Sequence, residues 1–340
     1  MSDAERQNQD VAALRAFLAA AGLCRETAVC MIEPLTGGVS SDIVLVHCEE
    51  RVFVVKRALA RLKVAREWTA PVSRNASEVG YMREAARIVP GAVPEILADD
   101  PDFGGYAMEF LAPDHHPVWK AELRDGRVDL AFAARLGTIM SRIHAGTHGR
   151  ADIAATFDTG ELFHALRLEP YLEATADGHP ELRAALFALS AQTAAIKSAL
   201  VHGDISPKNI LCGPDGPVIL DAECAWHGDP AFDLAFCLNH LLLKCLWNPS
   251  AAQAFLACFD RLAASYLDGV TWEEPDALEV RAARLLPALL LARVDGKSPA
   301  EYLDEAGKGV IRRFAPPLIL KPVARLASIR QAWAKENCLD

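Results

Sequence analysis

Polar side chains gather in one short segment of the chain, "LVHGDISPKNIL" at residues 200–211. The segment sets His202, Asp204, Lys208 and Asn209 between apolar pairs at its two ends. This pattern is typical of a loop that strands hold rigidly while its side chains face a ligand. Gly, Asp, Ser, Pro and Asn also occur together in ordinary turns for local reasons, so the rest of the chain has to decide between the two interpretations.

A second polar cluster follows in "VILDAECAWHGDPAFD", where Asp221 and Glu223 are two residues apart. Side chains two apart in an extended segment share a face, so both carboxylates can project from the end of an apolar strand at 218–220. Neighbouring carboxylates repel each other unless a cation lies between them. Together with the amide oxygen of Asn209 they form an all-oxygen set, which favours Mg²⁺ over zinc.

The two clusters together resemble a known catalytic arrangement. "HGDISPKN" has the H-x-D-x-x-x-x-N spacing of the protein-kinase catalytic loop, with Gly203 in place of Arg. An HGD loop followed by a D-x-E segment resembles the aminoglycoside phosphotransferase and choline kinase superfamily, which phosphorylates small molecules. The resemblance implies that Asp204 takes the proton of the acceptor hydroxyl, and that Asn209, Asp221 and Glu223 hold Mg²⁺ beside ATP.

The resemblance also assigns nucleotide-binding residues earlier in the chain. Lys56, at the end of the apolar run in "VFVVKRAL", corresponds to the phosphate-binding lysine. Its partner on the next helix is expected to be Glu78, with Glu84 as the alternative. The other expected nucleotide contacts are two glycines and a serine that cradle phosphates, and backbone groups that bind adenine in "AMEFL": Gly37, Gly38, Ser40, Glu109 and Leu111.

A narrower resemblance concerns the acceptor. The D-x-E segment, Trp119 after "AMEFL", and the tandem Arg312-Arg313 are similar to features of the 5-methylthioribose kinase branch, and imply that these three residues contact substrate. Asn209 departs from that branch, which carries Ser there, and agrees with the broader superfamily. The arginine pair also fits a helix C-terminus, where it would complement the helix dipole.

The elements that must position these residues can be read from the apolar spacing. A helix is predicted over 11–22, followed by a hairpin with strands at 43–46 and 52–55. The later segments are a helix at 74–89, a strand at 105–111 and a mainly helical remainder broken by short apolar runs at 200–201 and 217–220. We expect an α+β, two-lobed protein-kinase-like fold. It would have a β-rich nucleotide-binding lobe at 1–111 and a helical catalytic and acceptor-binding lobe at 112–340.

Composition restricts the remaining possibilities. The 340 residues carry a formal net charge of -10, which argues against nucleic acid or an anionic membrane as the partner. The nine cysteines are isolated and include no C-x-x-C, which predicts free thiols in a reducing compartment, with neither a disulfide framework nor a zinc site. The apolar stretch 231–247 contains charged residues and is expected to be a core helix. With no signal-peptide pattern at the polar N-terminus, a cytoplasmic protein is expected, and a homodimer is left open.

The expected reaction is ATP-dependent phosphorylation of a hydroxyl on a sugar-like metabolite. An aminoglycoside or an amino alcohol of the choline type is the alternative, because an acidic acceptor lobe would attract a cation. A catalytically silent nucleotide-binding protein is a rival from another class, opposed by the complete set of Lys56, Asp204, Asn209 and Asp221. The acceptor's identity, its reacting hydroxyl and the choice between ATP and GTP stay open. His202, His144 and Asp233 are expected to be structural.

Overall fold

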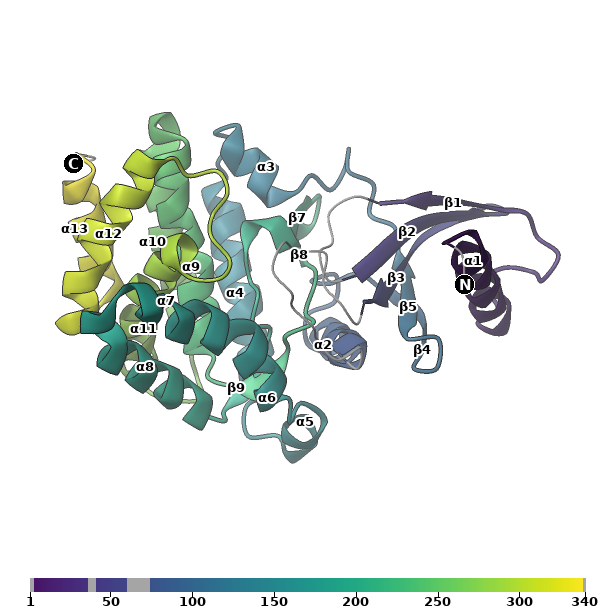
Figure 1. Cartoon of the computed structure of the whole chain (residues 1–340), viewed down its shortest axis with the longest axis horizontal. Helices are drawn as coiled ribbons and strands as arrows, with labels where there is room; N and C mark the ends of the chain where they lie inside the picture. Colours follow the sequence, from purple (N-terminus) through teal and green to yellow (C-terminus); the bar gives the residue numbers. More distant parts are fainter. Residues whose placement is uncertain (1–2, 36–40, 60–73, 339–340) are drawn as a thin grey trace. The chain divides into compact units, whose positions relative to one another are not determined.

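The structure, a computed structural model, describes residues 3–35, 41–59 and 74–338, with side chains from Val11 onward. Gly37, Gly38 and Ser40 lie outside the described residues. The contacts divide the chain into two compact units (Figure 1). Unit 1 comprises Met1–Glu84 and Pro94–Leu111, and unit 2 comprises Ala85–Val93 and Ala112–Asp340. Unit 1 is built around a small antiparallel sheet and unit 2 is mainly helical, so the predicted fold class is confirmed.

Unit 1 contains a five-stranded antiparallel sheet in the order β1-β2-β3-β5-β4. The strands are β1 (Cys30–Pro34), β2 (Ser41–Cys48), β3 (Arg51–Ala58), β4 (Ile96–Asp100) and β5 (Gly105–Glu109). The helices are α1 (Asp3–Ala20) and α2 (Arg74–Ile88), and the last turn of α2, from Ala85 onward, is counted with unit 2. β2 and β3 form the predicted hairpin, with Val46 opposite Phe53. Apolar β-branched and aromatic residues favour such paired strands because they pack against one another across the sheet.

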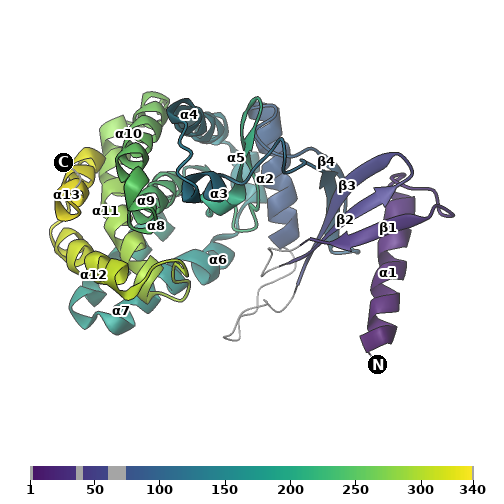
Figure 2. The same ribbon diagram turned by 90° about the horizontal axis from the view of Figure 1, so that it is seen from above.

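Helix α1 covers one face of this sheet (Figure 2). Leu14, Phe17 and Leu18 of α1 form one hydrophobic cluster with strand residues that include Val46 and Phe53. The ring of Phe17 is stacked on Phe103, with centroids 4.6 Å apart. The burial of these side chains fixes the helix on the sheet, since each fully buried aliphatic or aromatic side chain contributes about 1.5–3 kcal/mol.

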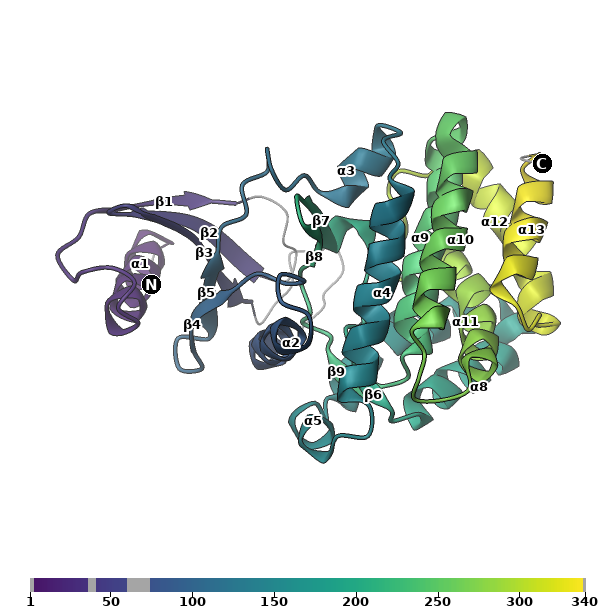
Figure 3. The ribbon, with the colours of Figure 1, turned by 180° about the vertical axis from the view of Figure 1, so that it is seen from behind.

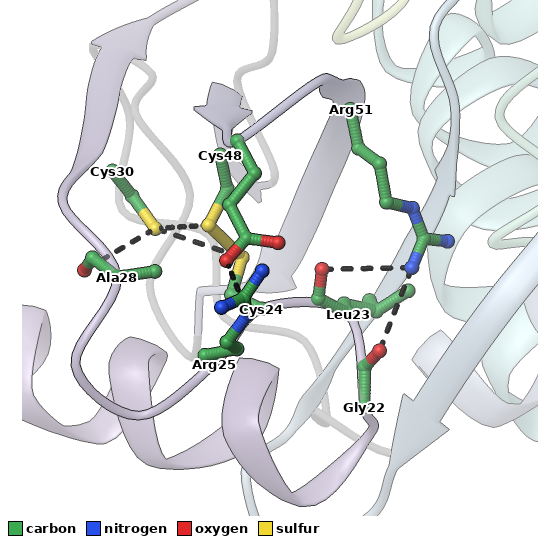
Figure 4. The surroundings of a disulfide bond; sticks show 9 residues. Gly22, Leu23, Cys24, Arg25, Ala28, Cys30, Cys48 and Arg51 are labelled. Atoms are coloured by element: carbon green, nitrogen blue, oxygen red, sulfur yellow. Dashed lines mark hydrogen bonds and ion pairs between the residues drawn. A yellow bond between two sulfur atoms is a disulfide. The ribbon is translucent and has the colours of Figure 1, made fainter.

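Three cysteines of unit 1 meet at the end of α1 (Figure 4). Cys24 and Cys48 are joined by a disulfide, with Cα atoms 6.2 Å apart. The Sγ atom of Cys30 lies 2.6 Å from that of Cys48 and 3.6 Å from that of Cys24. Among the residues that the structure describes, this is the only group of three His, Cys, Asp or Glu ligand atoms within 4.8 Å of one another. The expectation of free thiols throughout is wrong for this pair, because the fold brings together cysteines that are 24 residues apart.

Unit 2 packs its helices around α9 (Ala231–Trp247), whose residues are buried almost throughout (Figure 3). The other long helices of this unit are α4 (Leu130–Thr147), α8 (Arg183–Ala195), α10 (Ala252–Asp268), α11 (Pro275–Asp295), α12 (Glu305–Leu320) and α13 (Leu326–Glu336). Shorter helical segments are α3 (Trp119–Arg124), α5 (Ala151–Thr156), α6 (Gly160–Phe163), η1 (His164–Glu173), α7 (Ala174–Gly178), η2 (Pro180–Leu182), η3 (Pro207–Asn209) and η4 (Pro249–Ala251). The core helix predicted at 231–247 is confirmed by α9, which has the same bounds. Among the described residues, no helix is both long and apolar enough to cross a bilayer.

Candidate active site

Two short antiparallel strand pairs hold the polar loop of unit 2. β6 (Ala199–Val201) pairs with β9 (Trp226–Gly228), and β7 (Ile210–Gly213) pairs with β8 (Gly216–Ile219). The N–H of Leu220 donates to the carbonyl of Asn209 at 2.8 Å, which extends the second ladder by one step. Asn209, the residue before β7, therefore lies beside the end of β8. The polar loop that contains Asp204 and the segment that contains Asp221 thus become neighbours.

Hydrogen bonds from buried side chains fix the backbone of the loop. Asp233, at the start of α9, accepts from the N–H groups of His202 and Gly203, both at 2.8 Å. His202 donates from Nε2 to the carbonyl of Leu220 at 3.1 Å and accepts at Nδ1 from the N–H of Asp204. Burial lowers the pKa of His202, so the ring is neutral and suits this donor–acceptor role. His144 contacts Asp233 and Tyr266 at 3.3 and 2.7 Å, and all three expected structural residues act as supports.

Gly203 occupies a position where a side chain would be strained. Its φ angle is +80°, in the left-handed region. A Cβ atom there would lie 3.0 Å from the carbonyl oxygen of Cys224 and 3.1 Å from the ring of Phe163. The arginine that protein kinases carry at this point would therefore meet a strained backbone and close contacts in this loop.

Asp204 is almost completely buried and lies between two cations. Its Oδ2 atom is 2.9 Å from Nη2 of Arg167 and 3.2 Å from Nζ of Lys208. Burial by itself would raise the pKa of Asp204, but Lys208 and Arg167 outweigh it and the pKa lies below the usual value. The carboxylate is therefore ionised at neutral pH and available to hold a hydroxyl group.

Arg167 is the functional candidate that sequence reasoning missed. It lies on η1, a π-helix interrupted by Pro170, whose ring nitrogen cannot donate a backbone hydrogen bond. The guanidinium donates to the carbonyls of Gly203 at 2.5 Å and Leu166 at 2.7 Å as well as contacting Asp204. Pro170 in a helical pattern signals an interruption, but nothing in the sequence indicates which side chain it would direct toward the loop.

The residues expected to hold the metal lie just before β7 and just after β8, which the hydrogen bond between Asn209 and Leu220 brings side by side. Asn209 donates from Nδ2 to the carbonyl of Asp204 at 3.1 Å, so its amide oxygen points away from that bond. Asp221 has a φ angle of +66°, a conformation that few residues other than glycine adopt and that is concentrated at functional sites. Asp221 and Glu223 are both partly exposed. An amide oxygen and two accessible carboxylates are hard ligands, and this donor set fits Mg²⁺.

Unit 1 contains a buried ion pair that links its sheet to α2. Nζ of Lys56, on β3, lies 2.8 Å from Oε1 of Glu78, and both side chains are at most 5 % exposed. The structure thus pairs Lys56 with Glu78, the first of the two glutamates considered. Because either charge would be left without compensation if the other moved away, the pair holds the lysine in a defined position.

The remaining candidates occupy other positions. Glu109 accepts a hydrogen bond from the N–H of Glu95 at its carboxylate, and Leu111 follows β5 with its side chain partly buried. Trp119 is 2 % exposed and packs against Phe132. Arg312 and Arg313 form ion pairs near the surface. Their carboxylate partners are Asp295 and Glu305 for Arg312, and Glu336 for Arg313. The structure does not place Trp119 or either arginine at Asp204.

The combination of this fold with an HGD loop, a buried aspartate and a Lys–Glu ion pair defines a protein of the kinase-like phosphotransferase class. Comparison with family models identifies the family. The model described as the phosphotransferase enzyme family matches residues 31–265, and the chain belongs to this family.

Individual relatives and structures are more distant. The chain is 27% identical over 218 residues to methylthioribose kinase of Erwinia tasmaniensis, a match that covers 56% of this chain and 54% of the relative. It is 24% identical to methylthioribose kinase of Escherichia coli O45:K1, covering 61% of this chain and 56% of that protein. The chain therefore spans about half the length of the curated relatives it matches.

Solved structures agree with the fold. Choline kinase of Cryptosporidium parvum Iowa II superposes with a TM-score of 0.53 at 14% identity, covering 92% of this chain and 99% of that one. Amicoumacin kinase hAmiN, solved in complex with AMP-PNP, Ca²⁺ and Ami, gives a TM-score of 0.52 at 15% identity and covers 88% of this chain and 91% of its own. At these identities the likeness shows the fold alone.

Proposed function

We propose that this protein is an ATP-dependent phosphotransferase that transfers the γ-phosphate to a hydroxyl of a small, sugar-like molecule. The observation that carries the proposal is the setting of Asp204. Hydrogen bonds of Asp233 and His202 fix its loop, and two cations keep it ionised. Asn209 donates to its backbone carbonyl, and the charge of Asp221 acts on its carboxylate. Phosphoryl transfer depends mainly on positioning and charge neutralisation, and these residues supply both.

Each residue has one task in the reaction. Asp204 accepts a hydrogen bond from the acceptor hydroxyl, orients its oxygen and takes up its proton as the bond to phosphorus forms. Lys56, held by Glu78, provides a positive charge for the phosphates of the nucleotide. Asn209, Asp221 and Glu223 would hold Mg²⁺, which neutralises charge on the transferred group when bound. Arg167 keeps Asp204 ionised and in place.

A sugar-like acceptor is proposed because the curated relatives are methylthioribose kinases. A cytoplasmic location and a small-molecule partner belong to the same proposal.

The test is a search for a phosphorylated product. The protein is incubated with MgATP and a metabolite extract, and new phosphate esters are sought by mass spectrometry, with Asp204→Asn as the matched variant. We expect a product whose rate of formation falls about 10²–10⁴-fold in the variant. Calorimetric titration with MgADP should give similar affinities for both proteins. Equal turnover by the variant contradicts the assignment of Asp204, and nucleotide binding without any product supports a silent nucleotide-binding protein.

A further inference from the structure

Three cationic side chains of unit 2 lie together, and the part of the chain that the structure describes gives none of them an acidic partner. Lys244, on α9, is 1% exposed, and its Nζ atom lies 3.8 Å from the ring centroid of Tyr302 and 4.1 Å from that of Trp247. Nζ of Lys120, on α3, lies 5.7 Å from the same Tyr302 centroid. We name Lys120, Lys244 and Arg293 the cationic cluster.

Arg293, on α11, adds a partly unused guanidinium. Its Nη1 atom donates to Oγ of Ser298 at 2.9 Å and lies 3.5 Å from the hydroxyl of Tyr171. Its Nε atom is buried without a hydrogen-bond partner in the described part of the chain, and so is the hydroxyl of Tyr302. Across residues 3–35, 41–59 and 74–338, the ion pairs found include no carboxylate bound to any member of the cationic cluster.

The charges in this region repel one another. Burial, followed by the charges of Lys120 and Arg293, lowers the pKa of Lys244 to about 6. Burial and the same three cations, together with Lys208, lower the pKa of His240 well below its usual value. Buried ammonium and guanidinium groups are costly unless an opposite charge compensates them. A bound anion would supply that compensation.

Contacts between side chains connect the cationic cluster to Asp204. The guanidinium carbon of Arg293 lies 6.0 Å from the ring centroid of Tyr171, and that of Arg167 lies 5.9 Å from the same centroid. Arg167 in turn contacts the carboxylate of Asp204. Tyr171 therefore lies between Arg293 of the cationic cluster and the arginine that contacts the proposed base.

We propose that the acceptor carries an anionic group, a carboxylate or a phosphate, which Lys120, Lys244 and Arg293 bind while Tyr302 and Trp247 pack against its carbon skeleton. This inference rests on the proposed function and specifies its substrate class. It opposes the amino-alcohol alternative, because a choline-like or aminoglycoside cation would meet like charges here. The net charge of -10 favoured a cationic acceptor instead. A net charge summed over the chain does not describe the local charge of one cluster of side chains.

The first test separates binding of the acceptor from stability. Lys244→Met keeps a similar volume between the two rings and removes the charge. We expect the KM for the acceptor to rise about 10–100-fold, with the KM for ATP and kcat changed less than about threefold. The ligand-free variant should also melt at a higher temperature than the wild type at pH 7. The folded protein holds Lys244 uncharged, with a pKa of about 6, whereas the unfolded chain keeps it protonated, and this difference lowers the stability of the wild type. Lys321→Met, which removes an exposed lysine after α12, is the matched control and should change none of these values.

The second test identifies the charge of the acceptor. A metabolite extract is separated by ion exchange into anionic, neutral and cationic fractions, and each is incubated with enzyme and MgATP. We expect the product only from the anionic fraction. Treatment of that fraction with alkaline phosphatase before the assay distinguishes the two sources, since a phosphate-bearing acceptor is lost and a carboxylate-bearing one survives. A product from the neutral or cationic fraction alone overturns the inference and leaves the phosphotransferase intact.

The third test needs no turnover. Acetate, inorganic phosphate and choline are titrated into the protein by calorimetry in buffers of different ionisation enthalpy. Because Lys244 has a pKa of about 6, binding of an anion at pH 8 should take up about one proton per site. Proton uptake should disappear in Lys244→Met. Absence of anion binding, or binding with equal proton uptake in the variant, overturns the inference even when no fraction contains an acceptor and the proposed function fails.

Discussion

Replacement of Arg167 by Met is the most informative single substitution in unit 2. Arg167 is 7% exposed and Asp204 is 4% exposed, so solvent screens their contact only weakly. Removal of one partner from a buried ion pair typically costs about 3–5 kcal/mol, because the other charge is left without compensation. Lys208 still faces Asp204, but 54% of its side chain is exposed. We therefore expect a loss of stability near the lower end, about 3 kcal/mol.

The pH dependence of this stability has a definite sign. The pKa of Asp204 lies below its value in an unfolded chain, about 3.9. Asp204 therefore contributes stability that is fully present above pH ~4 and is lost as the pH falls through the lower folded value. In Arg167→Met one of the groups that oppose the effect of burial on Asp204 is lost, while Lys208 and His202 stay, so the pKa of Asp204 rises. The acid limb of kcat/KM, which reports this group in the free enzyme, should then move to higher pH.

Urea denaturation at pH 7 measures the stability, and kcat/KM between pH 4 and 8 measures the titration. Arg183→Met, at an exposed arginine paired with Asp177, is the matched control and should change neither quantity. Arg167→Lys should restore part of the stability, because an ammonium group replaces only one branch of the guanidinium contacts. An unshifted acid limb together with a loss below 0.5 kcal/mol would refute the role given to Arg167.

Three further predictions concern other parts of the two units. Lys56→Met should lower the free energy of unfolding, measured in urea, by about 3–5 kcal/mol, because Glu78 loses its buried cation. The double variant with Glu78→Gln should recover part of that loss, and no recovery would show that the pair is not coupled. Gly203→Ala should lower the free energy of unfolding by at least about 1 kcal/mol, seen as a lower urea midpoint. The added Cβ would crowd Cys224, and alanine disfavours the φ of +80° at this position. An unchanged midpoint would mean that the loop relaxes freely. Asp221→Asn should fold normally, since Asn tolerates a left-handed backbone. The variant should need a Mg²⁺ concentration about tenfold higher or more for half-maximal rate, and an unchanged requirement would remove Asp221 from the metal ligands.

Local spacing was sufficient to predict most of the architecture. The hairpin of β2 and β3, the core helix α9 and the two short strands on either side of the polar loop follow from apolar runs whose period and length are read directly. The proximity of Asn209 to the segment after β8 was also predictable, because H-x-D-x-x-x-x-N and D-x-E form a recognisable pair. These features depend on neighbours in the sequence.

What could not be predicted depends on contacts between residues far apart in the chain. Arg167 lies 36 residues before Gly203, on a helix whose register is altered by its π-helical turn. The meeting of Cys24 with Cys48 and the convergence of Lys120 with Lys244 are likewise products of tertiary packing. None of these side chains belongs to a motif, and each would be taken for an ordinary surface or core residue from its neighbours alone.

The supply of a guanidinium to the catalytic loop from η1 has an evolutionary consequence. In protein kinases the arginine of the H-R-D motif belongs to the loop. Here the backbone at Gly203 disfavours any side chain, and Arg167 contacts the loop from outside it. Loss of the arginine at 167 alone leaves the loop without a guanidinium, and replacement of the glycine at 203 alone introduces a strained side chain. Positions 167 and 203 should therefore be inherited as a pair among homologues of this chain, and an alignment that recovers Gly203 without a basic residue at 167 would indicate a different way of holding the aspartate.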